Sequence, residues 1–153
     1  MKQKITSCLL GMGLLVAVGL SYGADRFSYS SDGSEVTDNT TGLIWKRCAE
    51  GMTWSGSSCT GSATKYRHKA ALQLRINGWR LPNIKELASI VDRSKSNPAI
   101  TDPSAFPNTP YDTFFWSSSP YVGYSEYAWY VDFNDGEVAN NYRDNDFYVR
   151  LVR

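Results

Sequence analysis

The segment Gly78–Leu87 constrains the fold more than any other part of the chain. Pro82 cannot lie inside a helix, and it favours an extended backbone at Leu81. Asn83 and Glu86 stand three residues apart, which is the spacing of a helix capping box. The apolar side chains of a helix that begins here would be Ile84, Leu87, Ala88 and Val91. The sequence therefore predicts a short buried strand before the proline and a helix directly after it, a packing hinge rather than a catalytic motif.

The N-terminus has the pattern of a secretory signal peptide. Lys2 and Lys4 precede an uncharged run over residues 5–20, and the small residues Ser21 and Gly23 suit a cleavage site. The apolar run is shorter than the ~20 residues of a spanning helix. We expect a signal peptide over 1–23, a mature domain over 24–153 and no stable membrane span after processing. An uncleaved anchor is the alternative. An exported protein would be periplasmic, on the cell surface or extracellular.

Size and charge limit the classes of partner. The mature chain fits one domain, since domains usually hold ~100 to 200 residues. Removing Lys2 and Lys4 from the formal net charge of +1 leaves −1, which argues against nucleic acid as a partner. Basic residues gather in the middle of the chain, and after Lys95 there is no lysine. A solvated helix face and an anion site are the two interpretations of that basic middle.

Two cysteines remain after processing, Cys48 and Cys59. In an oxidising compartment they predict a disulfide that closes a small loop, worth about 3 kcal/mol. A metal site is the alternative, but these cysteines and the lone His68 do not make four ligands. Trp54 lies inside the loop, either as a lid on the core or as a platform for a sugar.

The remaining pattern is mostly that of short strands. Expected strands or strand-like segments are Phe27–Tyr29, Glu35–Asp38, Leu43–Lys46, Trp79–Leu81, Thr113–Ser118, Tyr127–Phe133, Glu137–Ala139 and Phe147–Arg153. Asn134-Asp135-Gly136 is typical of a hairpin turn. Within 127–133, Trp129, Val131 and Phe133 would share one face. Thr64–Asn77 has helical character, and His68 within it would be a packed or solvated histidine.

The C-terminal half has the composition of a binding surface. From Ser117 to Tyr148, 16 of 32 residues are Tyr, Ser, Asn or Gly. Tyrosine offers rigid contact area, and the small polar residues offer adaptable hydrogen bonds, as in antibody paratopes. A tyrosine-rich sheet with ordinary polar turns is the alternative. The candidate ligand-binding residues are Tyr121, Tyr124, Tyr127, Asn140, Asn141, Tyr142, Arg143, Asp144 and Asp146.

The sequence patterns that would indicate catalysis or metal binding are weaker than those that indicate a binding surface. Acidic residues around the predicted hairpin, such as Asp132 and Glu137, have the spacing of a turn and its neighbouring loop. Asp132, Asn134 and Glu137 offer oxygen ligands for calcium, but the complete calcium loop is missing. We therefore predict no catalytic residue, no metal and no cofactor, with calcium as the alternative.

Five motifs in order resemble the Lcl C-terminal domain family. They are Asp38-x-x-Thr41-Gly42-Leu43-Ile44-Trp45, Trp79-Arg80-Leu81-Pro82-x-x-Lys85-Glu86-Leu87, Phe115-Trp116-Ser117-Ser118-Ser119, Trp129-x-x-Asp132-Phe133-x-x-Gly136 and Tyr148-Val149-Arg150-Leu151-Val152-Arg153. The Arg-Leu-Pro element and the closing Val-Arg strand also look like the formylglycine-generating-enzyme branch of C-type-lectin-like folds. The resemblance implies an α+β fold: a single compact C-type-lectin-like domain with two helices and mixed, mainly antiparallel strands.

The resemblance also bears on function. The family's namesake is the head of a collagen-like surface adhesin, although no Gly-x-y repeat occurs here. The chain lacks the carboxylate and proline calcium signature of sugar-binding C-type lectins, and it has no cysteine after Cys59 to match the redox-active cysteines of the formylglycine enzyme. We expect a secreted or surface-exposed, non-catalytic binding module that recognises a protein or a carbohydrate ligand on a cell surface or matrix. A structural envelope or pilus-associated component is the alternative, followed by an enzyme of the formylglycine-generating type.

Overall fold

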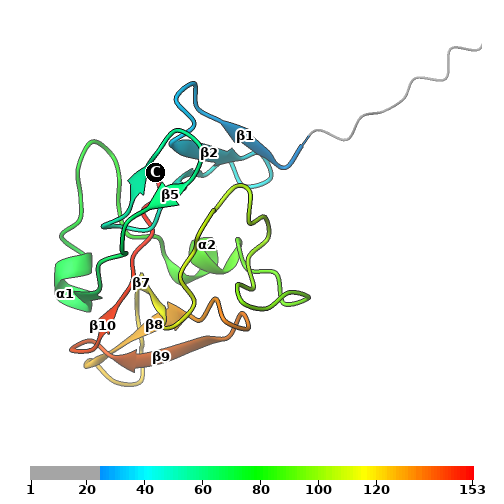
Figure 1. Cartoon of the computed structure of the whole chain (residues 1–153). Helices are drawn as coiled ribbons and strands as arrows, with labels where there is room; N and C mark the ends of the chain where they lie inside the picture. Colours follow the sequence, from blue (N-terminus) through cyan, green and yellow to red (C-terminus); the bar gives the residue numbers. More distant parts are fainter. Residues whose placement is uncertain (1–24) are drawn as a thin grey trace, which may run out of the picture.

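The structure is a computed structural model that describes residues 25–153 (Figure 1). The predicted signal peptide over 1–23 lies outside these residues. The elements are β1 (Phe27–Tyr29), β2 (Glu35–Asp38), β3 (Ile44–Lys46), β4 (Thr53–Trp54), β5 (Cys59–Thr60), β6 (Tyr66–Arg67), α1 (His68–Ala71), α2 (Ile84–Ala88), β7 (Phe115–Pro120), β8 (Tyr127–Val131), β9 (Val138–Tyr142) and β10 (Asp146–Phe147). They form a small, mostly β domain with two short helices and antiparallel strands. Within residues 25–153, no helix is long and apolar enough to cross a membrane.

The N-terminal sheet has the order β1-β2-β3 and is antiparallel, as predicted. Its turns contain Gly33 and Gly42, whose φ angles of 71° and 74° suit glycine. Asp38 at the end of β2 is fully buried and accepts two hydrogen bonds from Arg26, at 3.2 and 2.7 Å. Burial raises the pKa of Asp38, but the bonds from Arg26 and the Thr40 amide outweigh it, so the net pKa is lowered.

The hinge around Pro82 forms largely as predicted. The Asn83 side chain accepts from the Glu86 amide, and the Glu86 carboxylate accepts from the Asn83 amide, which completes a capping box. The helix ends at Ala88 instead of Val91. The segment before Pro82 is not a strand, since it makes only single β-bridges, of which the one from Arg80 reaches Val152 near the chain end. Instead of a strand, this segment therefore has single bridges, one of them to a residue far away in the chain.

The predicted helix over Thr64–Asn77 forms only in part. Residues 66–67 form β6, which pairs with β10, and α1 covers only His68–Ala71. Asn77 takes a φ of 51°, which ends any helical path. Tertiary pairing with β10 and this left-handed residue together override the local helical pattern.

The C-terminal sheet has the order β7-β8-β9 (Figure 1). Its strands are antiparallel, and Tyr127 to Val131 pair in register with Tyr142 to Val138. The predicted turn between β8 and β9 is present, with Gly136 at a φ of 84°. Figure 1 shows this sheet and the β1–β2 end of the molecule on opposite sides of α2.

The closing segment 147–153 is not one strand. Phe147 belongs to β10, Tyr148 forms a parallel bridge to Phe115, and Val152 bridges to both Trp45 and Arg80. The chain end is therefore tied down, as expected, but to four partners, Tyr66 of β6, Phe115, Trp45 and Arg80, rather than to one. Because the backbone is extended, alternate side chains point to opposite sides. Tyr148 and Val152 enter one core cluster, and Phe147, Val149 and Leu151 enter the other.

Arg150 lies on the same side of this segment as Tyr148 and Val152, and it is fully buried. Its guanidinium donates to the carbonyls of Lys46 and Arg47 and to Thr109 Oγ1. No carboxylate of residues 25–153 forms an ion pair with it, and burial lowers its pKa to about 9. Arg150 therefore links the chain end to the loop after β3 and to the 101–114 loop.

Candidate functional site

Five aromatic side chains gather on one face of the β8–β9 ribbon: Tyr121, Tyr124, Tyr127, Trp129 and Tyr142. We call this cluster the tyrosine patch. Tyr121 lies 6.3 Å from Tyr124, 6.4 Å from Tyr127 and 5.3 Å from Trp129, measured between ring centroids. Tyr127 lies 5.7 Å from Tyr124 and 4.2 Å from Tyr142. The two predicted tyrosine-rich loops therefore meet in one continuous cluster.

Strand alternation explains why these rings share a face. Tyr127 pairs directly with Tyr142, and Trp129 pairs with Asn140, so these four side chains project to the same side. Ala128, which lies between Tyr127 and Trp129, projects to the opposite side, into the second core cluster. The chain between β7 and β8 turns back over the same face and adds Tyr121 and Tyr124.

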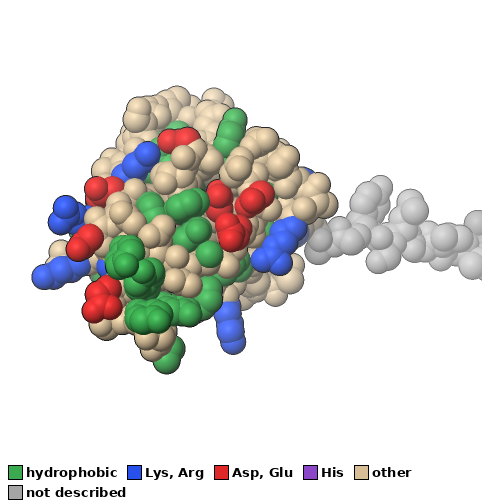
Figure 2. All heavy atoms as spheres, turned by 90° about the horizontal axis from the view of Figure 1, so that it is seen from below, with side chains coloured by type: hydrophobic (Ala, Val, Ile, Leu, Met, Phe, Trp, Pro, Cys, Tyr) green, Lys and Arg blue, Asp and Glu red, His purple; other side chains and the backbone are tan. Residues whose placement is uncertain are grey.

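The patch is open to solvent. Tyr124 is 64% exposed, Tyr142 is 55% exposed, and the neighbouring Val122 is 97% exposed. Figure 2 shows hydrophobic side chains gathered into a band on the face of the molecule that carries β8 and β9, with charged side chains at its margins. Clusters of this kind on a small domain mark interaction sites more often than scattered apolar residues do.

Trp129 was missed as a site residue. Trp129 and Val131 lie on the same face of β8, as strand alternation predicts, but different residues surround them. Val131 and Phe133 are buried in the first core cluster, and Val138 packs against it, as do Ile84 and Ala88 of α2. Trp129 lies beyond this cover and is only partly buried. No pattern within β8 could have revealed which of its residues other segments cover.

Tyr127 and Tyr142 have the closest rings in the patch, and their contact changes the pKa of Tyr127. Hydrogen bonding with Tyr142 raises the pKa of Tyr127 to about 12, with further contributions from desolvation and from nearby acidic groups. The phenol of Tyr127 therefore stays protonated through the neutral range. Both tyrosines can present a hydroxyl at the surface while their rings lie against each other.

The two candidate asparagines have different roles. Asn140 lies beside Trp129 on the face of the patch. Asn141 lies on the opposite face, and its Oδ1 accepts from the Tyr142 amide and from Asn145 Nδ2, at 2.8 and 2.9 Å. Asn141 therefore stabilises the turn after β9, and Asn140 is the one placed to meet a ligand of the patch.

Arg143 and Asp144 line a separate pocket of about 400 Å³, together with Arg67, His68, Lys69 and Leu72. Arg143 is held by a hydrogen bond of 3.0 Å from its Nε to the Tyr127 carbonyl. Asp146 is exposed and pairs with Arg67 in the β6–β10 ladder. The predicted site therefore divides into an aromatic part on the sheet and a charged part beside α1.

His68 is a packed histidine, one of the two roles that the sequence suggested. It is 1% exposed, its Nε2 lies 2.9 Å from the Ser117 carbonyl oxygen, and its ring packs edge-on against Trp116. Desolvation lowers the pKa of His68, although the contact with the Ser117 carbonyl works in the other direction. Because a carbonyl only accepts, Nε2 carries the proton and Nδ1 is an acceptor in the neutral ring.

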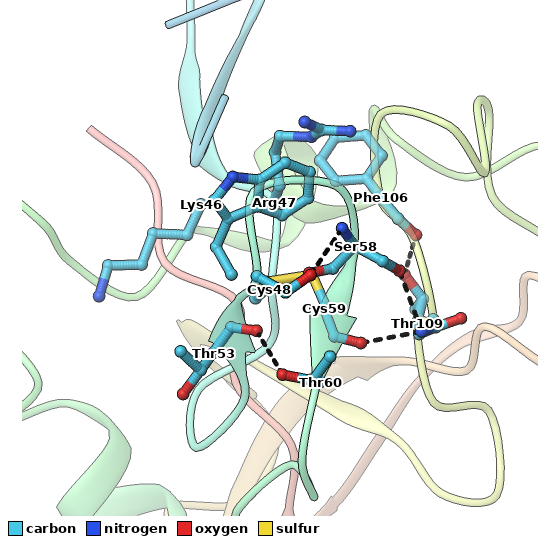
Figure 3. The surroundings of a disulfide bond; sticks show 12 residues. Lys46, Arg47, Cys48, Thr53, Ser58, Cys59, Thr60, Phe106 and Thr109 are labelled. Atoms are coloured by element: carbon cyan, nitrogen blue, oxygen red, sulfur yellow. Dashed lines mark hydrogen bonds between the residues drawn. A yellow bond between two sulfur atoms is a disulfide. The ribbon is translucent and has the colours of Figure 1, made fainter. Parts of the chain in front are cut away.

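The disulfide loop is a second aromatic and cationic region. Cys48 and Cys59 are bonded, as predicted, and Figure 3 shows the bond beside the β4–β5 hairpin and Arg47. The Trp54 indole donates to the Asp32 carbonyl at 2.9 Å, and the Arg47 guanidinium carbon lies 4.1 Å from the Trp54 ring centroid. Trp54 therefore packs on Arg47, which agrees with a lid rather than an open platform.

The acidic residues of the β8–β9 hairpin serve the turn. The Asp132 carboxylate accepts from the Asn134 amide at 2.7 Å, and the Asp135 carboxylate accepts from the Glu137 amide at 2.9 Å. Among residues 25–153, no group of three His, Cys, Asp or Glu side chains is placed to hold a metal ion. The geometry of this hairpin is that of side chains capping their own backbone.

Comparison with known proteins identifies one family. A family model described as the Lcl C-terminal domain matches residues 34–153. No curated protein shows a significant match to the chain. The matched region includes all five motifs, the disulfide, the Arg150 core and the tyrosine patch. The chain belongs to the Lcl C-terminal domain family.

Proposed function

We propose that this protein is a secreted or surface-exposed binding module, with a C-type-lectin-like fold and no catalytic role, that uses the tyrosine patch to contact a protein or glycan ligand. The observation that carries the proposal is the exposure of Tyr124, Tyr142 and Val122 around a cluster of five packed rings. Export rests on the signal peptide expected over residues 1–23. Adhesin-like recognition is the role that the family resemblance favours.

The physical chemistry of the patch suits recognition. Aromatic rings bring large contact area with few rotatable bonds, so ordering them on binding costs little entropy. Neighbouring rings in the patch already restrict one another, which further lowers that cost. The rings can stack on the apolar faces of sugars or fill pockets of a protein, and the phenol groups can hydrogen bond at the rim.

The proposal is tested with the purified protein on glycan arrays and on intact cells or matrix. We expect a saturable ligand, and we expect Tyr124→Ala and Tyr142→Ala each to weaken binding about tenfold, as residues at an interface centre do. Tyr111→Ala is the matched control, because Tyr111 is 45% exposed but lies outside the patch. Its binding should equal that of the unmodified protein.

Two results would contradict the proposal. One is unchanged binding of the selected ligand after both patch substitutions. The other is the absence of any ligand on arrays, cells and matrix together with stable incorporation of the protein into an envelope or pilus fraction, which would favour the structural role instead.

A further inference from the structure

The C-terminal sheet has one covered edge and one open edge. On the side of β7 away from β8, the Trp116 amide donates to the Tyr148 carbonyl at 3.0 Å, and the Ser118 amide donates to the Pro82 carbonyl at 2.8 Å. At the other edge, β9 pairs with β8 and with no further strand of residues 25–153. Figure 1 shows β9 at the margin of the domain. An uncovered edge is a place where another extended chain can pair.

The alternation of hydrogen bonds identifies which backbone groups of β9 are open. The Asp132 amide donates to the Glu137 carbonyl at 2.9 Å, so these two residues form a bonded pair. Bonded and unbonded pairs alternate in an antiparallel ladder, so Ala139 is the next residue of this strand to bond to β8. Val138 and Asn140 therefore direct their amide and carbonyl groups away from β8. No hydrogen bond joins these four groups to another group of residues 25–153.

The open stretch ends at Tyr142, whose backbone groups are used locally. The Tyr142 amide donates to Asn141 Oδ1 at 2.8 Å, and the Tyr142 carbonyl accepts from the Asn145 amide at 3.1 Å. Two donors and two acceptors thus remain, repeated every second residue. The backbone of an extended peptide carries complementary groups at that repeat, and a sugar ring does not. This spacing favours a polypeptide as the partner.

The open edge also lies between two places that can receive side chains. Val138 and Asn140 project to the face of the tyrosine patch, because they pair with Val131 and Trp129. The patch lies beyond Asn140. At the other end is a pocket of about 230 Å³, lined by Val138, Ala88, Val91 and Arg93. A strand added to β9 would place its alternate side chains along this same line.

We propose that an extended peptide segment of a partner protein adds to β9 as a fourth strand of the sheet. One apolar side chain enters the pocket beside Val138, and an aromatic side chain two residues away lies against the tyrosine patch. Backbone hydrogen bonds to Val138 and Asn140 set the register, and the pocket and the patch select the sequence. This inference rests on the proposed function, since it uses the same patch, and it names a polypeptide rather than a glycan as the ligand.

The probes are acetylated and amidated pentapeptides of the form Thr-X-Thr-Z-Thr. X is Val, Ile or Leu, Z is Tyr, Phe or Trp, and a second set exchanges X and Z. Each peptide is titrated into the purified protein, with the ¹H–¹⁵N shifts and hydrogen exchange of the backbone amides as readouts. We expect a Kd of about 1 mM for the best peptide. At ten times that concentration, exchange of the Val138 and Asn140 amides should slow about tenfold, as the occupied fraction requires.

Backbone methylation of the best peptide separates strand addition from side-chain contacts alone. Alternate amides of a strand face opposite edges. In an antiparallel arrangement, N-methyl groups at X and Z remove the donors that face β9, whereas one at the central Thr changes the far edge. We expect the first peptide to bind about tenfold more weakly than the parent and the second to bind equally well. The reverse preference would assign a parallel strand.

Variants of the protein test the same edge. Asn140→Pro removes one outward donor without removing a bond to β8, and proline is tolerated on edge strands. Asn140→Ala keeps that donor and is the matched reference. We expect the proline variant to bind the best peptide about tenfold more weakly than the alanine variant, with urea unfolding showing that both are folded. Tyr111→Ala, outside the edge and the patch, should leave the Kd unchanged.

The inference is overturned if no peptide of either set binds saturably, if both methylated peptides bind as the parent does, or if binding leaves the exchange of the Val138 and Asn140 amides unchanged. Protection of these amides in the free protein together with a dimeric mass would also overturn it, because a second copy would then cover the edge. If the arrays select a glycan that needs Tyr124 and Tyr142 and no peptide protects these amides, strand addition fails and the proposed function stands.

Discussion

The aromatic rings of the first core cluster and those of the tyrosine patch differ in what covers them. In the core, Phe106 packs edge-on against Phe27, and Phe115 packs edge-on against Phe133, with ring centroids 5.5 and 5.0 Å apart. The buried Arg150 guanidinium lies over Phe106 and Phe115. In the tyrosine patch, the rings are covered mainly by one another.

Under the proposed function, this difference separates the rings that stabilise the fold from those that would contact a ligand. A ring excluded from water on all sides contributes its full apolar area to folding. A ring that stays half exposed contributes little to folding and keeps its area for a partner. Strand β8 takes part in both, since Val131 at one end lies in the core and Tyr127 at the other end lies in the patch. Position along one strand, rather than residue type, decides which role a side chain has.

The largest expected effect is on the core. Phe115→Ala should lower the free energy of unfolding by about 4 kcal/mol, because it leaves a cavity among fully buried rings. Tyr142→Ala, the matched change in the patch, should lower it by less than about 1 kcal/mol. Urea unfolding of both variants measures the difference. Equal losses would show that the patch is part of the folding core.

The second largest expected effect on stability is that of removing the disulfide. Replacing Cys48 and Cys59 together by serine should lower the free energy of unfolding by about 3 kcal/mol, since the bond closes a loop with a sequence separation of 11. Ligand binding at the patch should persist at temperatures where the variant is folded. Loss of binding in the folded variant would mean that the disulfide loop contributes directly to recognition.

The helix cap has a smaller effect. Asn83→Ala removes half of the capping box at the start of α2 and should cost about 1 kcal/mol in thermal or urea unfolding. Lys85→Ala, on the exposed side of the same helix, should change stability by less than about 0.5 kcal/mol. An equal cost for both would show that the cap is not what holds α2 in place over β8.

The smallest effect is on the acidity of the patch. The pKa of Tyr127 is raised to about 12, above the ordinary 10.0, so its contribution to stability is complete below pH 10 and is lost as the pH rises from 10 toward 12. Tyr29, Tyr130 and Tyr148 also have raised pKa values, so phenolate absorbance should show several tyrosines that titrate late, one of which is Tyr127. Tyr142→Phe should bring the titration of Tyr127 back toward pH 10, and an unchanged titration curve would contradict the pairing of the two phenols.

Local patterns predicted much of this fold. The capping box at Asn83, the turn at Gly136, the three N-terminal strands and the disulfide all depend on residues near one another in the chain or on chemistry specific to cysteine. The predictions that differ from the structure concern contacts between segments far apart in the chain. Residues 66–67 became a strand because they pair with β10. The end of the chain pairs with four partners because it runs between the two core clusters.

In the candidate site, too, the sequence predicted some residues, and others depend on contacts between distant segments. Composition alone selected Tyr121, Tyr124, Tyr127 and Tyr142, since tyrosine-rich loops are typical of binding surfaces. It could not select Trp129, whose exposure depends on tertiary packing, nor separate Arg143 from the tyrosines. The pocket of Arg143 needs Arg67 and Lys69, which lie more than seventy residues earlier in the chain.

By itself, the sequence determined the local turns and caps, the pairing of Cys48 with Cys59 and the family of the chain, because each depends on residue identity over a few positions or on an ordered set of motifs. Only the tertiary structure decided which aromatic rings are buried, why Arg150 is enclosed without a carboxylate and where the charged pocket beside α1 lies. Exposure and electrostatic surroundings depend on segments distant in the chain, and the contacts between those segments form only when the whole domain packs.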